Sequence, residues 1–355
     1  MKTGLSFFFM ATDRDGTDQE IYREELALAD LAEPLGFDSV WGVEHHFTEY
    51  SMIPNPMQFL SYMAGRTKRI DLGSMVMVLP WHNPVRLASE IGMLDNLSEG
   101  RFQFGIGRGL GRLEFEGLGA SMDTSREVFD EAAETILAAL ESGFVEADGE
   151  FVRAPKRELR PRPTKTFRGR TYGAAVSPES VQSMARHGAG LIIIPQKPWD
   201  TVAGELELYR EAFAQHHPDR ETPAPIVACH VYCDSDAGRA AERGPMFNQA
   251  YYHRVMDHYG LSGDGFEKQK GYSYYASVAS RINRSGKDDA ADFYSNLHVY
   301  GTPEQCLEKI EWIKNTVQCD TFLSFFSYSG MPFEESRRNL ELFSEKVRPV
   351  IQAMD

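Results

Sequence analysis

The chain alternates short β-rich runs with longer amphipathic segments over most of its length. The short runs are apolar, β-branched or aromatic, which is typical of strands. We expect strands at residues 4–10, 37–41, 70–79, 102–106, 171–176, 190–195, 226–233 and 321–327. Strands that alternate with helical segments predict a parallel sheet covered by helices.

The segments between the predicted strands carry apolar residues at helical spacing. Within residues 19–35 the apolar positions recur at steps of seven, three and four, which places them on one buried stripe. The residues of this stripe are Ile21, Leu28, Leu31 and Leu35. Another helix is predicted at residues 84–97. A further helix should begin at Thr302, because Thr302 can cap it, a proline follows, and Gln305 can return a hydrogen bond to the cap.

Eight β/α units and a final helix predict an α/β fold, a (β/α)8 TIM barrel that residues 1–355 form as a single domain. Active sites in this fold lie at the C-terminal ends of the strands. Two insertions interrupt the alternation, at about residues 143–170 and 259–297. The second is long for an idle loop, and we expect it to be an active-site lid. Its candidate lid residues, which have a structural anchoring role as the alternative, are Tyr272, Tyr274 and Tyr275.

Composition excludes several classes of protein. A hydrophobic fraction of 42% and an aromatic fraction of 12% are enough for a substantial core, so disorder of the whole chain is excluded. Lys and Arg total 37 against 52 acidic residues, and the net charge of -15 argues against a nucleic-acid partner. No apolar stretch approaches the ~18 residues of a membrane span. We therefore expect a soluble, cytoplasmic protein that binds neither nucleic acid nor membrane.

The four cysteines show no spacing typical of a zinc site or a C-x-x-C pair. They are Cys229, Cys233, Cys306 and Cys319. We expect them to be reduced and buried, since free cysteine commonly behaves as a small core hydrophobe.

The most informative polar group follows the predicted strand at residues 37–41, where Glu44, His45 and His46 are consecutive. Neighbours on an extended chain point to opposite sides, and no H-E-x-x-H helix is present, so we expect no metal site here. A position at the C-terminal end of a barrel strand favours acid–base chemistry by at least one imidazole. The alternative is that one histidine packs in the barrel wall and the other caps a loop.

A second chemical candidate is the glycine-rich segment at residues 105–111, which surrounds Arg108. It is a poor dinucleotide fingerprint, because the third glycine of G-x-G-x-x-G would fall at Leu110 and no helix starts directly. The glycines would instead let a ligand approach the backbone, and Arg108 offers a fork of donors to a phosphate. A simple turn with a surface arginine is the alternative.

A third candidate site lies at the start of the helix that follows the predicted strand at residues 171–176. The hydroxyls of Ser177 and Ser180, with the free amides of the helix start, form a seat for an anion. The alternative is that Ser177 is only an N-cap residue. Arg126 lies near the start of another helix. It is either a functional residue or a solvated surface residue, and the sequence favours neither interpretation.

Together these segments resemble the flavin-dependent bacterial luciferase-like monooxygenase family, and are most similar to its catalytic (alpha) subunits. The similar segments are residues 36–50, 73–86, 94–110, 301–306 and 340–349. The resemblance implies a (β/α)8 barrel that takes FMNH2 from a separate flavin reductase and adds O2 to form a C4a-hydroperoxyflavin. One oxygen atom then passes to a small organic substrate, with an aldehyde among the candidates. It also implies a homodimer.

The resemblance further implies roles for individual residues. His45 would be the acid–base residue, supported by His46 and Glu44. The residues that would hold the FMN phosphate are Arg108, Arg126, Ser177 and Ser180, with the backbone of Leu110 near the flavin ring. Met75 and Val76 match the family's non-prolyl cis peptide, which lies against the isoalloxazine.

Departures from the luciferase pattern leave the substrate, the type of oxygen transfer and light emission open. The light-emitting subunits carry a cysteine at the position of Gly107, a tyrosine at Gly111 and a glutamate at Val176, and smaller residues at 81–83. Two alternatives also stay open. One is an F420-dependent oxidoreductase that transfers hydride and needs no O2, and the other is a non-catalytic partner subunit of the luciferase type.

Overall fold

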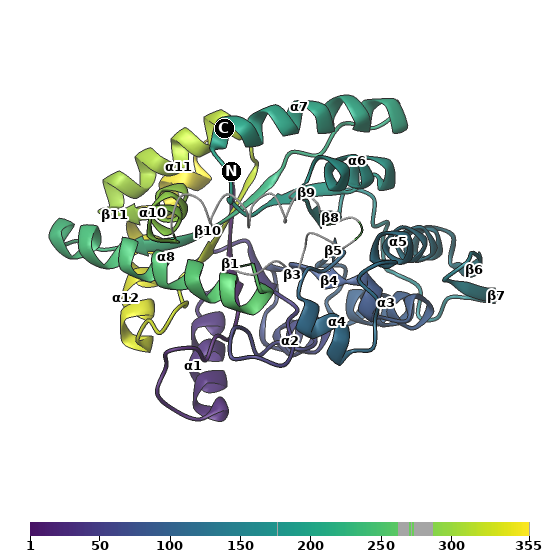
Figure 1. Cartoon of the computed structure of the whole chain (residues 1–355), viewed down its shortest axis with the longest axis horizontal. Coiled ribbons are helices and arrows are strands. Elements are labelled where there is room, and N and C mark those ends of the chain that lie inside the picture. The colour runs from purple at the N-terminus through teal and green to yellow at the C-terminus, as the bar shows by residue number, and fades with distance from the viewer. Residues whose placement is uncertain (176, 262–269, 271, 273–286, 355) are drawn as a thin grey trace.

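Eight parallel strands close into a barrel in a computed structural model of the chain, which describes residues 1–175, 177–261, 270, 272 and 287–354 (Figure 1). The barrel strands are β1 (Lys2–Phe7), β2 (Ser39–Gly42), β3 (Asp71–Ser74), β5 (Phe102–Gly107), β8 (Thr171–Ala174), β9 (Gly190–Ile193), β10 (Ile226–Cys233) and β12 (Thr321–Phe325). They pair in that order, β10 pairs with both β9 and β12, and β12 pairs with β1, which closes the ring. The predicted (β/α)8 barrel is confirmed.

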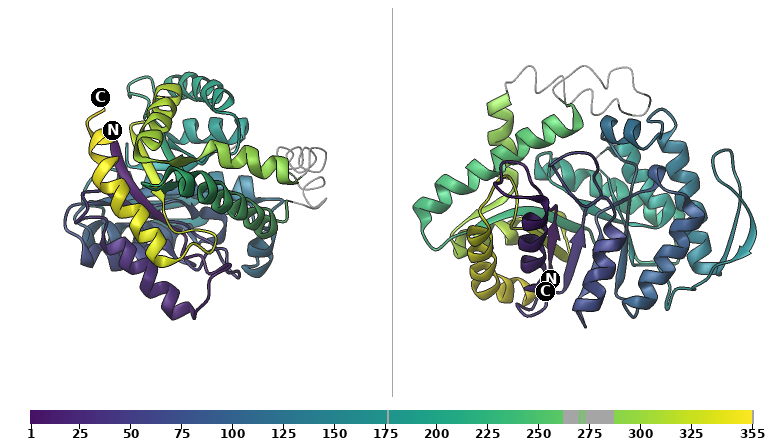
Figure 2. Two further views of the ribbon diagram at one scale, coloured as in Figure 1. Left: turned by 90° about the vertical axis from the view of Figure 1, so that its left-hand side faces the viewer. Right: turned by 90° about the horizontal axis from the view of Figure 1, so that it is seen from below.

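Helices surround the barrel in all three views (Figures 1 and 2). They are α1 (Asp18–Asp30), α2 (Pro56–Arg66), α3 (Pro84–Leu97), α4 (Arg112–Gly117), α5 (Ser125–Ser142), α6 (Pro178–His187), α7 (Trp199–His216), α8 (Ala237–Tyr259), α10 (Lys287–Leu297), α11 (Pro303–Val317), α12 (Phe333–Lys346) and α13 (Arg348–Gln352). The predicted capping box at Thr302 and Gln305 is present. The chain ends lie side by side, and the Met1 ammonium donates to the Met354 carbonyl at 2.7 Å (Figure 2).

The strand predicted at residues 70–79 is interrupted. It divides into β3 and β4 (Met77–Val78), which pairs with β5, and the Met75–Val76 peptide between them is cis. Glycines on β5 make room for this irregular segment. A Cβ atom on Gly107 would lie 2.3 Å from Val76 Cγ2. The space beside Gly107 is therefore occupied by Val76.

Aromatic side chains fill the barrel where strands β1 and β12 end. Phe8, directly after β1, stacks on Phe325 of β12 with ring centroids 4.3 Å apart. Phe8 also lies 5.3 Å from the ring of Tyr251 on α8. These residues belong to one buried cluster that also contains Trp41, Met75 and other apolar groups. The carboxyl ends of the strands therefore surround an aromatic interior.

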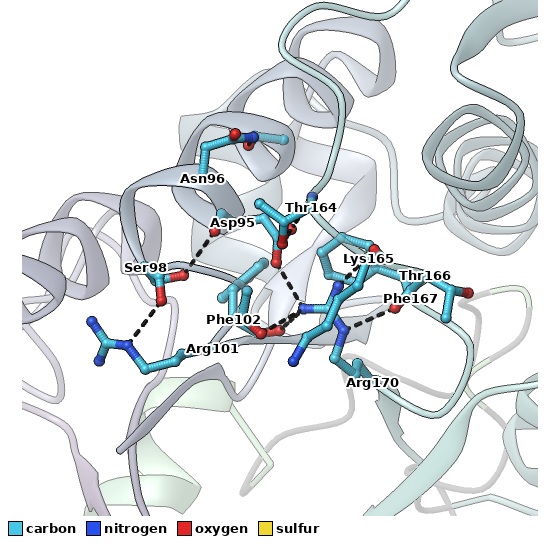
Figure 3. A network of polar contacts seen from close by, with 12 residues as sticks. Asp95, Asn96, Ser98, Arg101, Phe102, Thr164, Lys165, Thr166, Phe167 and Arg170 are labelled. Atoms are coloured by element: carbon cyan, nitrogen blue, oxygen red, sulfur yellow. Dashed lines mark hydrogen bonds and ion pairs between the residues drawn. The ribbon is translucent and has the colours of Figure 1, made fainter. Parts of the chain in front are cut away.

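A buried ion pair holds the opposite end of the barrel (Figure 3). The Arg170 guanidinium precedes β8 and donates to Asp95 Oδ1 on α3 at 2.7 Å and to the Phe102 carbonyl at 2.8 Å. The second oxygen of Asp95 accepts hydrogen bonds from the amide and hydroxyl of Thr164, at 2.6 and 2.7 Å. These contacts join α3, the insertion at residues 143–170 and the strands β5 and β8. They lie at the N-terminal ends of the strands, away from the expected active-site face.

The two predicted insertions differ in what the structure describes. Residues 143–170 contain a two-stranded antiparallel hairpin, β6 (Phe144–Asp148) and β7 (Arg153–Glu158), which extends from the side of the barrel (Figure 1). Most of 259–297, including Tyr274 and Tyr275, lies outside the described residues. Tyr272 is described and is fully buried.

The four cysteines are free and buried, as expected. A search of the described ranges for helices long and apolar enough to cross a membrane finds none.

Candidate active site

The two adjacent histidines after β2 turn to different carboxylates. His45 Nδ1 lies 3.1 Å from Glu114 Oε1 on α4, whereas His46 Nε2 lies 3.5 Å from Glu44 Oε1. The separation follows from extended backbone, in which successive side chains point to opposite sides. His45 and His46 therefore belong to two distinct polar clusters, each built around one buried glutamate.

Glu44 fixes the segment that follows the cis peptide. Its Oε2 accepts the Val78 amide at 2.6 Å, and its Oε1 lies 2.7 Å from His82 Nε2. Burial alone would raise the pKa of Glu44, but hydrogen bonds from His46, His82 and the Val78 amide outweigh it and lower that pKa. The carboxylate is thus ionised, and its described partners are His46, His82 and the Val78 amide, whereas His45 pairs with Glu114.

His82 was not identified as a site residue from the sequence. It follows a short 3-10 turn (Leu79–Trp81). In the sequence, His82 was notable only because residues 81–83 differ from the smaller residues of the luciferase pattern. Burial opposes protonation of His82, but the hydrogen bond and charge of Glu44 outweigh burial and raise its pKa. Glu44 and His82 therefore form an ion pair beside the cis peptide.

The Glu44–His82 pair predicts a pH-dependent part of the free energy of unfolding. The raised pKa of His82 contributes stability that is fully present below the ordinary histidine value of 6.5 and is lost as pH rises through the folded pKa. The lowered pKa of Glu44 contributes stability that is present above 4.5 and is lost as pH falls through the folded pKa. The stabilisation of wild type over His82→Gln, measured by urea unfolding, should be larger at about pH 6 than at about pH 9. An equal difference at both pH values would contradict the pairing.

Glu114 forms the second cluster. It is fully buried, and its Oε1 accepts the His46 amide at 2.8 Å in addition to facing His45. His258, near the end of α8, places Nε2 3.5 Å from Glu114 Oε2, and the Tyr259 hydroxyl lies 3.5 Å from His45 Nε2. Burial would raise the pKa of Glu114, but the interactions with His258 and His45 lower it to about 2. The cluster thus contains a permanently ionised carboxylate between two imidazoles.

His45, Glu114 and His258 are the group of described residues whose ligand atoms lie close enough to hold a metal ion, all within 4.8 Å of one another. Glu114 Oε1 already accepts the His46 amide and faces His45 Nδ1 at hydrogen-bond distance. Glu114 Oε2 and His258 Nε2 lie 3.5 Å apart, which is an ion-pair contact, and neither atom makes a hydrogen bond within the described residues. We interpret the group as a network of hydrogen bonds and an ion pair.

Three of the predicted phosphate residues lie together at the start of α6. Ser177 Oγ caps the helix by accepting the Ser180 amide at 3.3 Å and lies 2.9 Å from Ser180 Oγ. The Arg126 guanidinium of α5 reaches the same helix through Glu179 Oε2 at 3.3 Å. Ser177 therefore has the N-cap position that the sequence allowed, with Ser180 and Arg126 beside it. Val176 lies outside the described residues.

Tyr272 contacts both Arg108 and the start of α5. The Arg108 guanidinium lies over the Tyr272 ring, 4.0 Å from its centroid. The Tyr272 hydroxyl donates to the Gly109 carbonyl at 3.2 Å and lies 3.1 Å from Ser125 Oγ, the residue before Arg126. Tyr272, one of the predicted lid residues, thus contacts the glycine-rich segment.

The chemistry of this donor set fits the phosphate of FMN. Two guanidinium groups, two hydroxyls and the first turn of the ten-residue helix α6 supply positive charge and hydrogen-bond donors. Glu179, the carboxylate among them, is 63% exposed and therefore free to turn toward solvent. Three of the partly buried apolar side chains that pack against the buried cluster around Met75 come from the segments that the resemblance places near the flavin ring or from residues 81–83. They are Val76, Trp81 and Leu110.

The chain is similar to known monooxygenases over most of its length. The family model described as luciferase-like monooxygenase matches residues 1–317. The chain is 29% identical over 334 residues to an alkanal monooxygenase alpha chain of Photobacterium leiognathi, covering 93% of this chain and 94% of that one. It is 27% identical over 349 residues to the oxygenase component of a flavin-dependent trigonelline monooxygenase of Acinetobacter baylyi, covering 94% and 91%.

Among solved structures, the monooxygenase RslO1 from Streptomyces bottropensis superimposes with a TM-score of 0.79 at 29% identity, and 99% of each chain is covered. The agreement therefore extends from sequence to fold over nearly the full length. Together with the match over residues 1–317, it shows that the chain belongs to the luciferase-like monooxygenase family of enzymes.

Proposed function

We propose that the chain is the oxygenase of a two-component system that uses FMNH2 and O2 to oxygenate a small organic substrate, with aldehydes among the candidates. One observation carries the proposal. The short connection from β5 to α4 bears Arg108 near its start and leads to Glu114, so it joins the phosphate-type donors to the cluster around His45. The names of the curated relatives support the same chemistry.

When bound, reduced FMN would supply two electrons, with which one atom of O2 enters the substrate and the other leaves as water. The protein would contribute binding, orientation and proton transfer. Arg108, Arg126 and the start of α6 would bind the phosphate. His45 would accept or donate a proton at Nε2, which points toward Tyr259. The aromatic interior would limit access of water to the reacting atoms.

Anaerobic titration with reduced FMN and reduced F420 is the direct test. We expect the protein to bind reduced FMN more tightly. Mixing of the loaded protein with 18O2 and a panel of aldehydes should then place one labelled atom in the product, as detected by mass spectrometry. Preferential binding of F420 with hydride transfer that consumes no O2 would contradict the proposal, as would failure to bind either cofactor. Turnover by the purified chain alone would exclude the role of non-catalytic partner.

Loss of a phosphate donor should weaken FMN binding. Arg126→Gln should raise the dissociation constant of reduced FMN about tenfold to a hundredfold, because a hydrogen bond to a charged group is worth roughly 1.5–3 kcal/mol. The matched control is Arg168→Gln, an exposed arginine paired with Glu141 of α5. Fluorescence titration under anaerobic conditions measures both. Equal affinity in the two variants would remove Arg126 from the proposed phosphate site.

We also propose that a separate flavin reductase supplies the reduced cofactor and that the chain forms a homodimer. Light scattering of the purified protein measures the second point directly, and a molar mass near twice 40.0 kDa is the expected result. Activity that depends on added reductase and a reduced nicotinamide would support the first.

A further inference from the structure

Glu114 holds two histidines that come from distant parts of the chain. His45 follows β2, and His258 lies one residue before the end of α8. Both imidazoles point toward the same carboxylate, one at each oxygen. The side chains of Glu114 and His258 are 0% and 1% exposed, so their hydrogen bonds cannot be replaced by bulk water.

The contacts of Glu114 determine where His45 carries its proton. An ionised carboxylate can only accept hydrogen bonds. Its Oε1 accepts the His46 amide at 2.8 Å and lies 3.1 Å from His45 Nδ1, so this nitrogen must be the protonated one. In neutral His45 the lone pair then resides on Nε2. That atom faces the Tyr259 hydroxyl.

The same reasoning applies to His258. Its Nε2 is 3.5 Å from Glu114 Oε2, which is an ion-pair contact, and neither atom makes a hydrogen bond within the described part of the chain. Its Nδ1 lies 2.9 Å from Thr48 Oγ1, and its ring stacks on Tyr50 with centroids 4.5 Å apart. The charge of Glu114 favours the proton on Nε2, the nitrogen that faces the carboxylate, and the Thr48 hydroxyl can then donate to Nδ1.

Gly111 provides the space that this arrangement needs. A Cβ atom at this position would lie 2.2 Å from Glu114 Oε2, which no side chain tolerates without displacement of the carboxylate. The luciferase pattern has a tyrosine here, so the bridge between His45 and His258 depends on a feature in which this chain departs from that pattern.

We propose that Glu114 and His258 are positioning residues that keep the proton of His45 on Nδ1 and leave the lone pair of Nε2 facing the Tyr259 hydroxyl. Charged and titratable groups that face His45 come from α4 (Glu114), from the end of α8 (His258 and Tyr259) and from the loop after β2 (Tyr50). Glu114 is the anion among them. The meaning for catalysis rests on the proposed function, whereas the position of the proton does not.

Nitrogen NMR of the flavin-free protein tests the position of the proton independently of activity. Spectra of samples labelled with 15N-histidine at about pH 8 report which ring nitrogen is protonated. The signals of His45 and His258 are assigned by their loss in His45→Gln and His258→Phe. We expect a protonated Nδ1 and an unprotonated Nε2 for His45, and a protonated Nε2 for His258. In Glu114→Ala the His45 proton should redistribute toward Nε2.

Two further variants, each with two readouts, keep the test decisive. Glu114→Gln preserves the shape of the side chain and removes its charge, and Gly111→Ala displaces the carboxylate without removing it. Both should alter the His45 nitrogen signals while circular dichroism shows an intact fold. In the loaded enzyme, Glu114→Gln should lower kcat about tenfold to a hundredfold with KM for the organic substrate nearly unchanged, part of the ~10²–10⁴ that a positioned acid or base supplies.

Two results would overturn the proposal: a His45 proton on Nε2 in the wild type, or His45 signals that do not change in either Glu114 variant. Stoichiometric zinc whose removal by a chelator shifts the His45 and His258 signals would also overturn it, because a metal would replace the proton. Since the NMR experiment contains no flavin, it can succeed even if the proposed monooxygenase function fails.

Discussion

His45→Gln should lower the rate of substrate oxygenation by about 10²- to 10⁴-fold, the usual contribution of one general acid or base. Glutamine can still donate a hydrogen bond to Glu114 Oε1, so the buried carboxylate keeps a partner and the fold should survive. The affinity for reduced FMN should be nearly unchanged, because Arg108, Arg126 and the start of α6 are untouched. Flavin oxidation should continue with release of hydrogen peroxide in place of product.

The matched control for His45→Gln is His216→Gln, an exposed histidine in the last turn of α7. Mass spectrometry measures the yield of oxygenated product, and a coupled assay measures hydrogen peroxide. Their ratio shows how the electrons of the reduced flavin divide between product and peroxide in each variant. Full product yield in His45→Gln with unchanged FMN affinity would contradict an acid–base role. Loss of both flavin binding and product would instead indicate that His45 contributes to the cofactor site.

Arg170→Met should destabilise the folded state by about 3–5 kcal/mol, because it leaves a buried carboxylate without its cation. Asp95 is fully buried, and Arg170 also donates to the Phe102 carbonyl at 2.8 Å and to the Lys165 carbonyl at 2.9 Å (Figure 3). Methionine replaces the aliphatic part of arginine but none of these donors. Reversible chemical denaturation, followed by fluorescence, measures the change in the free energy of unfolding.

The control for Arg170→Met is Arg168→Met, two residues earlier, whose side chain is 68% exposed and paired with Glu141 at 3.6 Å. Exposed pairs contribute about 0–1 kcal/mol, so this variant should be close to wild type. Asp95→Asn combined with Arg170→Met should cost less than the sum of the single changes, because the uncompensated charge is gone. Additive costs would show that the ion pair contributes little beyond its separate hydrogen bonds.

The barrel could be predicted because each strand is encoded locally. Runs such as 226–233 are fully buried as β10, and the first turn of α11 forms the capping box that Thr302 and Gln305 allow. The interruption between β3 and β4 could not be read from apolar periodicity, since residues 70–79 look like one strand. It depends on the neighbouring β5, where a glycine at 107 leaves space for Val76.

Local pattern also located Glu44, His45 and His46, because all three follow one barrel strand. It did not find Glu114 or His258, which lie 69 and 213 residues from His45. Glu114 lies in a short helix where an acidic residue is normally solvated, and His258 ends a long amphipathic helix. Their burial arises only when α4 and the end of α8 close over the same strand end.

The sequence by itself thus determined the alternation of strands and helices, the resemblance to a family and the face on which polar residues gather. These properties depend on backbone geometry and on residues close together in the chain. The tertiary structure determines which carboxylate each histidine contacts. It also determines that the missing side chain of Gly107 leaves space for Val76 and that of Gly111 leaves space for Glu114. Hydrogen bonds and close packing act over a few ångströms, so such pairings exist only after distant segments have been brought together.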